Sequence, residues 1–312
     1  MSSTPQPRTA ADLYDLSYSI TSLLAEGGGI NESRAVILDL LGRRLGWEFA
    51  AWWVVDELKI VLRCREVWHA WGLEFPNFTK VSLARELSFG EGLPGMTWSS
   101  RQPVYLPDVT AHPNFPRASV AKMDGLRTGV ACPIYGSSTV FGVIEGFRRE
   151  KKLEPDPNVI NFLHALGGQI GVFVERSRAL EELNALSAQF RHLSETASDA
   201  IFTIDESSTI LFANSAIEPI LGYEPNELIG QKLTKIIPER LRSNHEHGIR
   251  HYVETGQRHL SWAGVVLPGL HKDGHEVLLE ISFAGFYRMS RRVFTGFARP
   301  RKTLTEQKGQ GS

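Results

Sequence analysis

One histidine is the strongest candidate for ligand chemistry in this sequence. Within residues 238–255, Leu241, His245, Ile249 and Tyr252 follow one another at steps of four, four and three residues. On an α-helix these steps place all four side chains on one face, and the apolar members indicate that the face points inward. A buried neutral imidazole can bind haem iron while apolar neighbours pack against the porphyrin. His245 is therefore a candidate haem ligand, and a hydrogen-bonded structural or pocket histidine is the alternative.

The other histidines and the cysteines form weaker patterns. His247 and His251 lie four residues apart, but no cysteine or carboxylate set near them completes a metal site, so we interpret both as exposed. We therefore expect a metal only as haem iron at His245. Cys64 and Cys132 match no metal or redox spacing, and Cys132 lies in a predicted strand, which is typical of a buried structural thiol.

Tryptophan is concentrated in one region of the chain. Five of the seven tryptophans lie between residues 47 and 71. Their alternation favours packing on a sheet and predicts that Trp47 and Trp53 lie on the same face of one strand. Trp53 and Trp68 are also candidates to line a ligand pocket, because aromatic side chains are common in pocket walls.

Composition limits the class of protein that holds these residues. The 312 residues are enough for two domains, and a net charge of −1 argues against binding to nucleic acid or to anionic lipid. No apolar run approaches the roughly 20 residues of a membrane-spanning helix, and the N-terminus lacks the apolar stretch of a signal peptide. With only two cysteines, the composition indicates a reducing compartment. We therefore expect a cytoplasmic protein that contacts neither a membrane nor nucleic acid.

Hydrophobic periodicity predicts two mixed units. The first has helices within 11–45, strands at 47–56 and 60–68, a glycine-rich loop at 89–95 with an irregular stretch after it, and a hairpin of 129–135 with 139–147. The second has strands at 200–205, 209–213, 258–267, 275–286 and 292–298, with helices inserted after its second strand. Both patterns predict an α+β fold with a central antiparallel sheet flanked by helices.

A long helix is predicted between the units, from residue 158 to about residue 198. Its apolar positions follow a heptad-like spacing with a short phase slip near Leu180. Two interpretations remain: an amphipathic helix that packs only on its own domains, or a connecting helix that pairs with a second copy. We favour the dimeric helix, because the apolar stripe continues beyond the plausible edge of either domain.

The longest motifs resemble two known domain families. In the second unit, FANSAIEPILGYEPNELIG (212–230), HKDGHEVLLEIS (271–282) and VFTGFAR (293–299) resemble a PAS domain. In the first unit, FGEGLPGMTWSSRQPVYLPDV (89–109), NFPRASVAKMDGLRTGVACPIYG (114–136), VFGVIEGF (140–147) and GGQIGVFVER (167–176) resemble a GAF domain of bacterial sensor kinases. The boundaries predicted from these motifs are 1–19 for an N-terminal segment, 20–176 for GAF, 177–198 for the connecting helix, 199–299 for PAS and 300–312 for a tail.

The PAS resemblance extends to a haem-binding subfamily found in oxygen-sensor kinases. SNHEHGIRHYVETG (243–256) is similar to the helix that carries the proximal ligand there, which implies that role for His245 and makes His259 a second family histidine. The family's distal arginine corresponds to Val265 in this chain. An apolar residue at that place implies a preference for carbon monoxide or nitric oxide over oxygen.

Signatures of catalysis are missing from the sequence. It contains no GxxxxGK[ST], GxSxG, HExxH, GGDEF-like or EAL-like segment. The kinases that the resemblance names carry a phosphoacceptor helix and an ATP domain after the last PAS domain, and residues 300–312 are too short for either. We therefore expect a sensory protein that is not itself an enzyme.

The predicted function is that of a GAF–PAS module in signal transduction, such as a two-component system. It would bind a small molecule or a partner and transmit its state through a dimeric connecting helix. Three alternatives stay open: a haem-based gas sensor using His245, the sensory input portion of a histidine kinase whose catalytic region is absent, and a dimerisation scaffold without a ligand. The expected partners are a second copy of the chain and a histidine kinase or another signalling protein.

Overall fold

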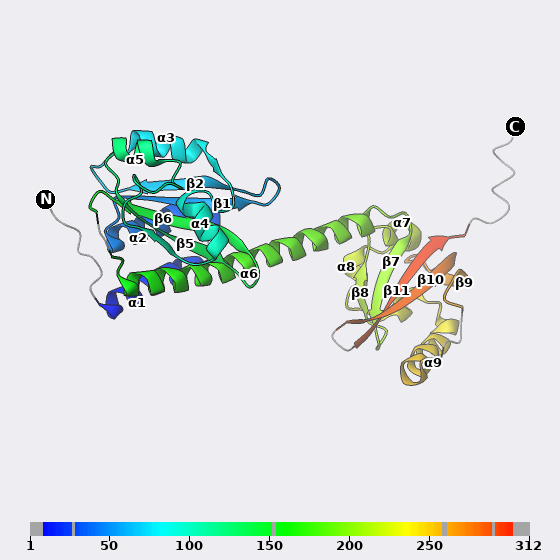
Figure 1. Ribbon diagram of the computed structural model, residues 1–312. Helices are drawn as coiled ribbons and strands as arrows, with labels where there is room; N and C mark the ends of the chain where they lie inside the picture. Colours follow the sequence, from blue (N-terminus) through cyan, green and yellow to red (C-terminus); the bar gives the residue numbers. More distant parts are fainter. Residues whose placement is uncertain (1–8, 27–28, 152–153, 258–260, 289–290, 302–312) are drawn as a thin grey trace, which may run out of the picture. The chain divides into compact units, whose positions relative to one another are not determined.

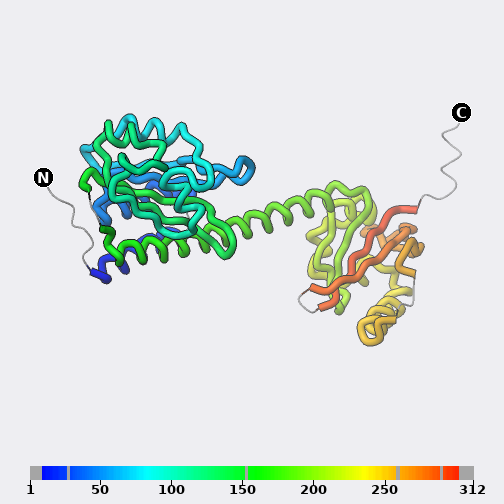
Figure 2. Tube along the Cα trace, viewed as in Figure 1, coloured from blue at the N-terminus to red at the C-terminus, as the bar shows by residue number. Residues whose placement is uncertain are grey.

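The computed structural model describes residues 9–26, 29–151, 154–257, 261–288 and 291–301, and the chain divides into two compact units. Unit 1 extends to Glu182 and unit 2 begins at Leu183 (Figures 1 and 2). Each unit is built on one antiparallel sheet flanked by helices, and the long helix α6 lies between the two sheets in the sequence. The predicted α+β class and its two-domain arrangement are confirmed.

Unit 1 contains a six-stranded sheet in the order β3-β2-β1-β6-β5-β4. Every paired strand in it is antiparallel. Its strands are β1 (Phe49–Asp56), β2 (Val61–His69), β3 (Glu86–Leu87), β4 (Val104–Leu106), β5 (Thr128–Tyr135) and β6 (Val140–Arg148). Its helices are α1 (Ala10–Ala25), α2 (Ile30–Leu45), α3 (Pro76–Ala84), α4 (Gly92–Ser100), α5 (Ala118–Met123) and the first part of α6 (Pro157–Glu195).

Helices cover both faces of this sheet, so unit 1 has two cores (Figure 1). Apolar residues of α1, α2 and α6 pack on one face, and those of α3, α4 and α5 pack on the other. The strand predicted at 47–56 is therefore buried on both faces, and its partner register shifts between Trp52 and Trp53. The prediction that Trp47 and Trp53 share a face is wrong, because Trp47 precedes β1 and joins the core opposite that of Trp53.

Two further expectations for unit 1 need correction. The glycine-rich segment 89–95 is not a loop throughout, because α4 begins at Gly92 within it. The stretch at 103–116, expected to be irregular, contains β4, and the short helix α5 that follows it was not predicted. Both elements are short, so they contain too few residues to show a helical or a strand period in the hydrophobic pattern.

Unit 2 contains a five-stranded antiparallel sheet in the order β8-β7-β11-β10-β9. The strands are β7 (Ala200–Asp205), β8 (Ile210–Ala213), β9 (Val265–Leu270), β10 (Glu276–Arg288) and β11 (Arg291–Pro300). Between β8 and β9 the chain forms α7 (Ile217–Leu221), α8 (Pro225–Leu228), the 3-10 helix η1 (Leu233–Ile236) and α9 (Glu239–Thr255). The helices are therefore inserted after the second strand, as the sequence predicts.

One strand of unit 2 is displaced from its predicted place. A strand was expected at 258–267, but β9 covers Val265–Leu270 and residues 258–260 lie outside the described part of the chain. Gly264 precedes the strand with a φ of 65°, a left-handed conformation that suits glycine and interrupts an extended chain. Pro268 is tolerated inside β9 because the strand lies at the edge of the sheet.

The long helix α6 divides into a packed part and an exposed part. Leu163, Leu166, Ile170 and Val174 are buried in a core of unit 1. By contrast, every residue from Arg178 to Leu193 is exposed. The predicted long helix is confirmed, and it ends at Glu195.

Candidate functional site

Unit 2 contains a partly open cavity of about 370 Å³ beside its sheet. Strands of the sheet supply one side of the wall, and α7, η1, α9 and the loop residues Ile237 and Trp262 supply the rest. Most lining side chains are apolar, and the polar exceptions are Asn244 and His245 of α9. The apolar lining includes Phe202, Ile204, Leu221, Leu233, Ile236, Leu241, Ile249, Tyr252, Trp262, Leu267, Leu279, Ile281, Phe283 and Phe294.

The cavity exists because α9 does not pack closely on the sheet. Although one of its faces is apolar, α9 has no fully buried residue. Leu241, Ile249 and Tyr252 are half-buried, and all three line the cavity together with His245. The four residues that the sequence places on one helix face are thus brought together in one wall, and whether they bind a ligand stays a prediction.

Contacts near both ends hold α9 in place. Close to its start, the Arg240 guanidinium lies 2.7 Å from a carboxylate oxygen of Glu276 on β10. At its end, Arg292 of β11 donates from Nη1 to the backbone oxygen of Tyr252 at 3.0 Å. A cation at this place also complements the free carbonyl groups of a helix C-terminus. The helix is therefore tied to the sheet at its ends, while the stretch between them faces the cavity.

His245 carries a specific polar contact. Its Nε2 lies 2.7 Å from Oγ of Ser208, a buried residue in the turn between β7 and β8. Burial lowers the pKa of His245 from its usual value near 6.5, and the neighbouring Glu246 opposes this shift. The imidazole is therefore neutral at neutral pH, and it can exchange a hydrogen bond with the Ser208 hydroxyl in either direction.

One further residue that the sequence assigned to this site, Val265, does not line the cavity. Val265 is half-buried in β9 and packs against the unit 2 core, but it is absent from the cavity wall. The cavity wall therefore gives no support to the expectation that Val265 lies on the distal side of a bound haem. His259 lies outside the described residues.

The tryptophans expected to form a pocket in unit 1 lie in different cores. Trp53 is fully buried beside α3 and α5, and its Nε1 donates to Oε1 of Glu145 at 2.8 Å. Trp68 packs against the opposite core, and its Nε1 donates to Asp39 at 2.9 Å. Because the sheet separates them, they do not line one pocket, and neither contributes to the cavity of about 50 Å³ described in this unit.

Sequence reasoning missed the group that occupies the space around Trp53. The fully buried Arg117 donates from Nη1 and Nη2 to both carboxylate oxygens of Glu145, each at 2.7 Å, and from Nη1 to Oγ of Ser82 at 2.8 Å. Its guanidinium carbon lies 4.7–5.8 Å from the ring centres of Trp53, Phe78, Phe115 and Phe147. A charged residue inside the apolar strand VFGVIEGF was the available signal, but nothing in the sequence named its partner.

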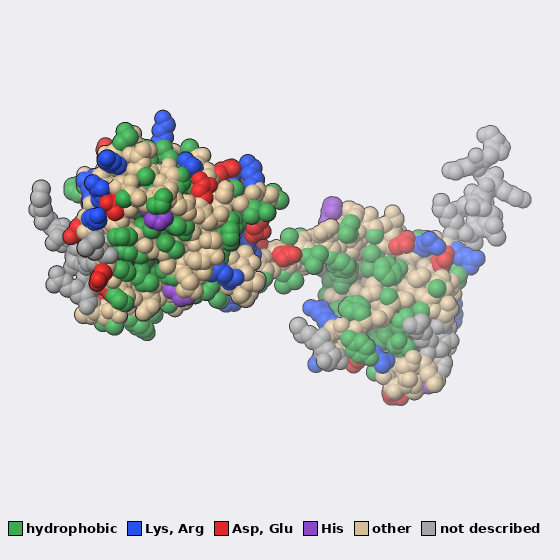
Figure 3. Space-filling view, viewed as in Figure 1, with side chains coloured by type: hydrophobic (Ala, Val, Ile, Leu, Met, Phe, Trp, Pro, Cys, Tyr) green, Lys and Arg blue, Asp and Glu red, His purple; other side chains and the backbone are tan. Residues whose placement is uncertain are grey.

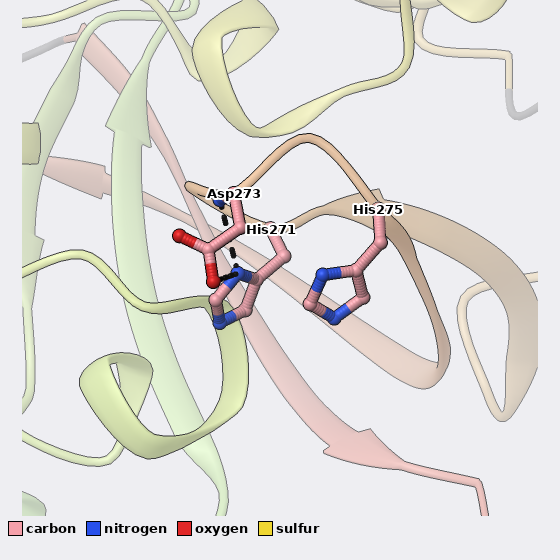
Figure 4. Close-up of side chains that lie close together, drawn as sticks. All are labelled: His271, Asp273 and His275. Carbon is pink, nitrogen blue, oxygen red and sulfur yellow. Dashed lines mark hydrogen bonds and ion pairs between the residues drawn. The ribbon is translucent and has the colours of Figure 1, made fainter.

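A second missed group lies in the turn between β9 and β10 of unit 2. His271, Asp273 and His275 bring one possible metal-ligand atom each within 4.8 Å of one another (Figure 4). The sequence shows them at alternate positions of HKDGH, a signal that was interpreted only as a hairpin motif.

Comparison with known families agrees with the two-unit structure. Residues 35–175 match the family model described as a GAF domain, and residues 188–301 match the model described as a PAS fold. The chain carries a GAF domain followed by a PAS domain. Unit 1 thus contains the GAF domain and unit 2 the PAS domain, whereas the predicted boundaries at 20–176 and 199–299 stay predictions.

Several curated proteins are similar to part of this chain. Sensor protein FixL of Bradyrhizobium diazoefficiens is 29% identical over 132 residues, which cover 41% of this chain and 26% of FixL. Oxygen sensor protein DosP of Escherichia coli is 27% identical over 107 residues, covering 34% of this chain and 13% of DosP. The chain therefore spans about a quarter or less of the length of these relatives.

Solved structures similar to the chain include a GAF domain. The GAF domain of a phosphoenolpyruvate-protein phosphotransferase from Coxiella burnetii is 18% identical, with a TM-score of 0.48, and the match covers 56% of this chain and 99% of that domain.

Among the described residues, no helix is long and apolar enough to cross a membrane.

Proposed function

We propose that this GAF–PAS protein is a sensor whose PAS cavity binds an apolar small molecule. The observation that carries the proposal is the cavity of about 370 Å³ between α9 and the sheet. Its volume lies within the range of roughly 300–1,000 Å³ typical of small-molecule sites, and such sites combine an apolar wall with a few polar groups. The curated names of the partial relatives FixL and DosP, both sensor proteins, support a sensory role.

The polar groups of the wall would orient the ligand. His245 and Asn244 are neighbours on α9, and both contribute to the cavity wall. A neutral imidazole can donate or accept a hydrogen bond, and an amide can do both at once. The ligand that fits this wall is therefore largely apolar and carries one uncharged polar group.

The PAS domain has a direct route to α6. Nδ2 of Asn214, just after β8, donates to the backbone oxygen of Ser194 at 2.7 Å, and the Ser215 backbone N–H donates to Glu195 at 2.7 Å. These bonds connect the end of α6 to the same core that lines the cavity. A ligand that favours one position of α9 would shift the population of PAS conformations, and α6 would carry that shift.

An environment-sensitive dye tests the cavity directly. Titration of the full chain with the uncharged dye Nile red should show one saturable site per PAS domain. Ile249→Trp, which fills the wall, should weaken dye binding at least tenfold, whereas Ile229→Trp on the exposed end of α8 should leave it unchanged. Equal binding by the three proteins, with unfolding midpoints that match, would refute a ligand cavity beside α9.

Haem is the second candidate ligand, because His245 lies in an apolar wall. The chemistry of the residues fits: a neutral imidazole would supply the axial nitrogen, and Leu241, Ile249 and Tyr252 would contact the porphyrin. Binding would require the His245 nitrogen now bonded to Ser208 to exchange that partner for iron. Bound haem would supply an iron centre that binds diatomic gases and absorbs visible light.

An absorption spectrum separates the two candidates. The full chain is measured before and after addition of hemin, beside His245→Ala. A Soret band that shifts with carbon monoxide and disappears in the variant would identify haem. A flat spectrum together with saturable dye binding would leave the apolar small molecule.

We also propose that α6 pairs with the α6 of a second copy. Leu183, Leu186, Phe190 and Leu193 follow a 3-4-3 spacing and are 61–65% exposed, and Figure 3 shows apolar side chains on the surface of this helix. Such spacing is that of a coiled-coil seam, and an unpartnered helical segment of this length is marginal in water.

The protein that reads the signal, a histidine kinase or another signalling protein, and the cytoplasmic location stay predictions.

Light scattering after size-exclusion chromatography tests the pairing. The unchanged chain should have twice its mass of 34.8 kDa, and Leu186→Glu should have the mass of a monomer. Ala188→Glu, on the opposite side of the helix, is the matched control and should remain a dimer. A monomeric mass for the unchanged chain would rule the pairing out.

A further inference from the structure

The turn between β9 and β10 gathers three side chains of the types that can bind metals. His271, Asp273 and His275 occupy alternate positions of a five-residue segment, and one possible ligand atom from each lies within 4.8 Å of the others (Figure 4). The imidazole rings of His271 and His275 are stacked, with 4.2 Å between their centres and 25° between their planes. None of these residues takes part in the cavity.

Backbone hydrogen bonds hold the turn in one conformation. The His271 N–H donates to the His275 oxygen at 2.8 Å, and the Gly274 N–H donates to the His271 oxygen at 2.9 Å. A third bond, from the Lys272 N–H to the Leu221 oxygen at 2.9 Å, ties the turn to the end of α7. The backbone positions of the three candidate ligand residues are therefore fixed without an ion, which would reduce the entropy lost on binding.

The side chains differ in their freedom in a way that suits a metal site. The His271 ring packs against Gly222 at the end of α7, and its side chain is only 18% exposed. Asp273 and His275 are exposed and can rotate. His271 thus provides a fixed donor, and the other two can close around an ion bound to it.

The charged side chains near the turn are compatible with a bound cation. The ammonium of Lys272 is directed to Glu227, with Nζ 2.7 and 2.8 Å from the two carboxylate oxygens. Glu276 is paired with Arg240. The Asp273 carboxylate lies 3.5 Å from Nδ1 of His271, so its negative charge is directed at the histidines.

We propose that this turn binds a divalent transition-metal ion of the Zn²⁺ type. Two imidazoles and one carboxylate form a donor set that suits Zn²⁺, Co²⁺, Ni²⁺ or Cu²⁺, whereas Mg²⁺ and Ca²⁺ prefer oxygen donors. Zinc bonds to these donors are about 2.0–2.2 Å long, so donor atoms that now lie within 4.8 Å of one another must move closer together, which rotation of the exposed Asp273 and His275 allows. Nδ1 of His271 accepts a hydrogen bond from the Asp273 N–H at 3.1 Å, and an ion bound at that atom replaces this bond.

The test measures Zn²⁺ binding by calorimetry on the full chain without a histidine tag, after removal of metals with a chelator. The unchanged protein should bind one Zn²⁺ at this turn, and both His275→Asn and Asp273→Asn should weaken that binding at least tenfold. His247→Asn removes an exposed histidine of α9 and is the matched control, with affinity unchanged. Circular dichroism of each variant verifies that its fold is retained.

The competing outcomes are distinct. Zn²⁺ affinities within twofold of the unchanged protein in both turn variants would overturn the proposal, as would the absence of saturable Zn²⁺ binding. Equal affinity for Mg²⁺ would also overturn it, because it would indicate attraction by carboxylates alone. The expected Co²⁺ complex adds a second readout, since visible absorption bands should appear and should be lost in His275→Asn.

Discussion

In the GAF domain, the sheet face beside α3 and α5 is filled by aromatic rings packed around Arg117, whereas in the PAS domain the sheet face beside α9 is hollow. The described cavities measure about 50 Å³ in the GAF domain and about 370 Å³ in the PAS domain. Both domains combine an antiparallel sheet with helices, so the fold class does not set this difference. It arises from the side chains. In the GAF domain, the buried guanidinium of Arg117 occupies space where a ligand could lie. In the PAS domain, the apolar face of α9 borders the cavity.

The largest expected effect comes from breaking the buried ion pair of the GAF domain. Arg117→Met removes the guanidinium and leaves the fully buried Glu145 carboxylate without its charge partner. We expect the free energy of unfolding to fall by about 3–5 kcal/mol. Denaturant unfolding followed by tryptophan fluorescence measures this, because six of the seven tryptophans lie in the GAF domain.

Two controls determine whether the loss comes from the unpaired charge. Arg43→Met breaks an exposed pair with Asp39 and should cost less than about 1 kcal/mol. The double variant Arg117→Met with Glu145→Gln removes both charges and should recover part of the loss. A cost below about 1 kcal/mol for Arg117→Met alone would contradict the closed, charge-paired core described for this domain.

A matched pair of substitutions compares the space in the two domains. Ile144→Phe enlarges a fully buried residue of the GAF sheet and should cost roughly 1–3 kcal/mol, because a packed core must shift to accept the larger ring. Ile249→Phe makes the same change in the wall of the PAS cavity, where the ring can enter free space. We expect Ile249→Phe to leave the free energy of unfolding unchanged or to raise it, as measured by denaturant unfolding. An equal loss in the free energy of unfolding for the two variants would show that the PAS domain in solution has no free space beside Ile249.

The face of α9 could be predicted from the sequence, but the charge pair of the GAF domain could not. Leu241, His245, Ile249 and Tyr252 belong to one helix, so the helical period alone fixes their common direction. Arg117 and Glu145 meet only because the chain folds back between them, and their contact spans 28 residues. A period describes neighbours within one element and gives no information on contacts between elements.

The separation of Trp53 and Trp68 into opposite cores depends on strand register. Two tryptophans in a paired hairpin can belong to opposite faces, and the face depends on a strand register that a bulge near Trp53 shifts. By contrast, HKDGH brings His271 and His275 together through local turn geometry, so the sequence contained that signal.

The smallest expected effect is a pH dependence confined to the PAS domain. Burial lowers the pKa of His245 from about 6.5 in the folded protein, so the unfolded chain binds a proton there at a higher pH than the folded chain does. Stability therefore rises with pH across this window and is lost as pH falls through 6.5 towards the lower folded pKa. Hydrogen-exchange mass spectrometry of PAS-domain peptides in the full chain, between pH 7.5 and 5.5 and corrected for the intrinsic exchange rate, measures the slope.

Two histidine variants isolate the group responsible for that slope. His245→Gln keeps a polar side chain near Ser208 but cannot titrate, so the fall in stability between pH 6.5 and 5.5 should become shallower. His247→Gln removes an exposed histidine from the same helix and should preserve the slope. An unchanged slope in His245→Gln would mean that His245 does not carry the titration, and the imidazole would then be as accessible to solvent as that of His247. That result would favour an open mouth beside α9 over an enclosed ligand cavity, because only exclusion of water from the wall disfavours the charged imidazole.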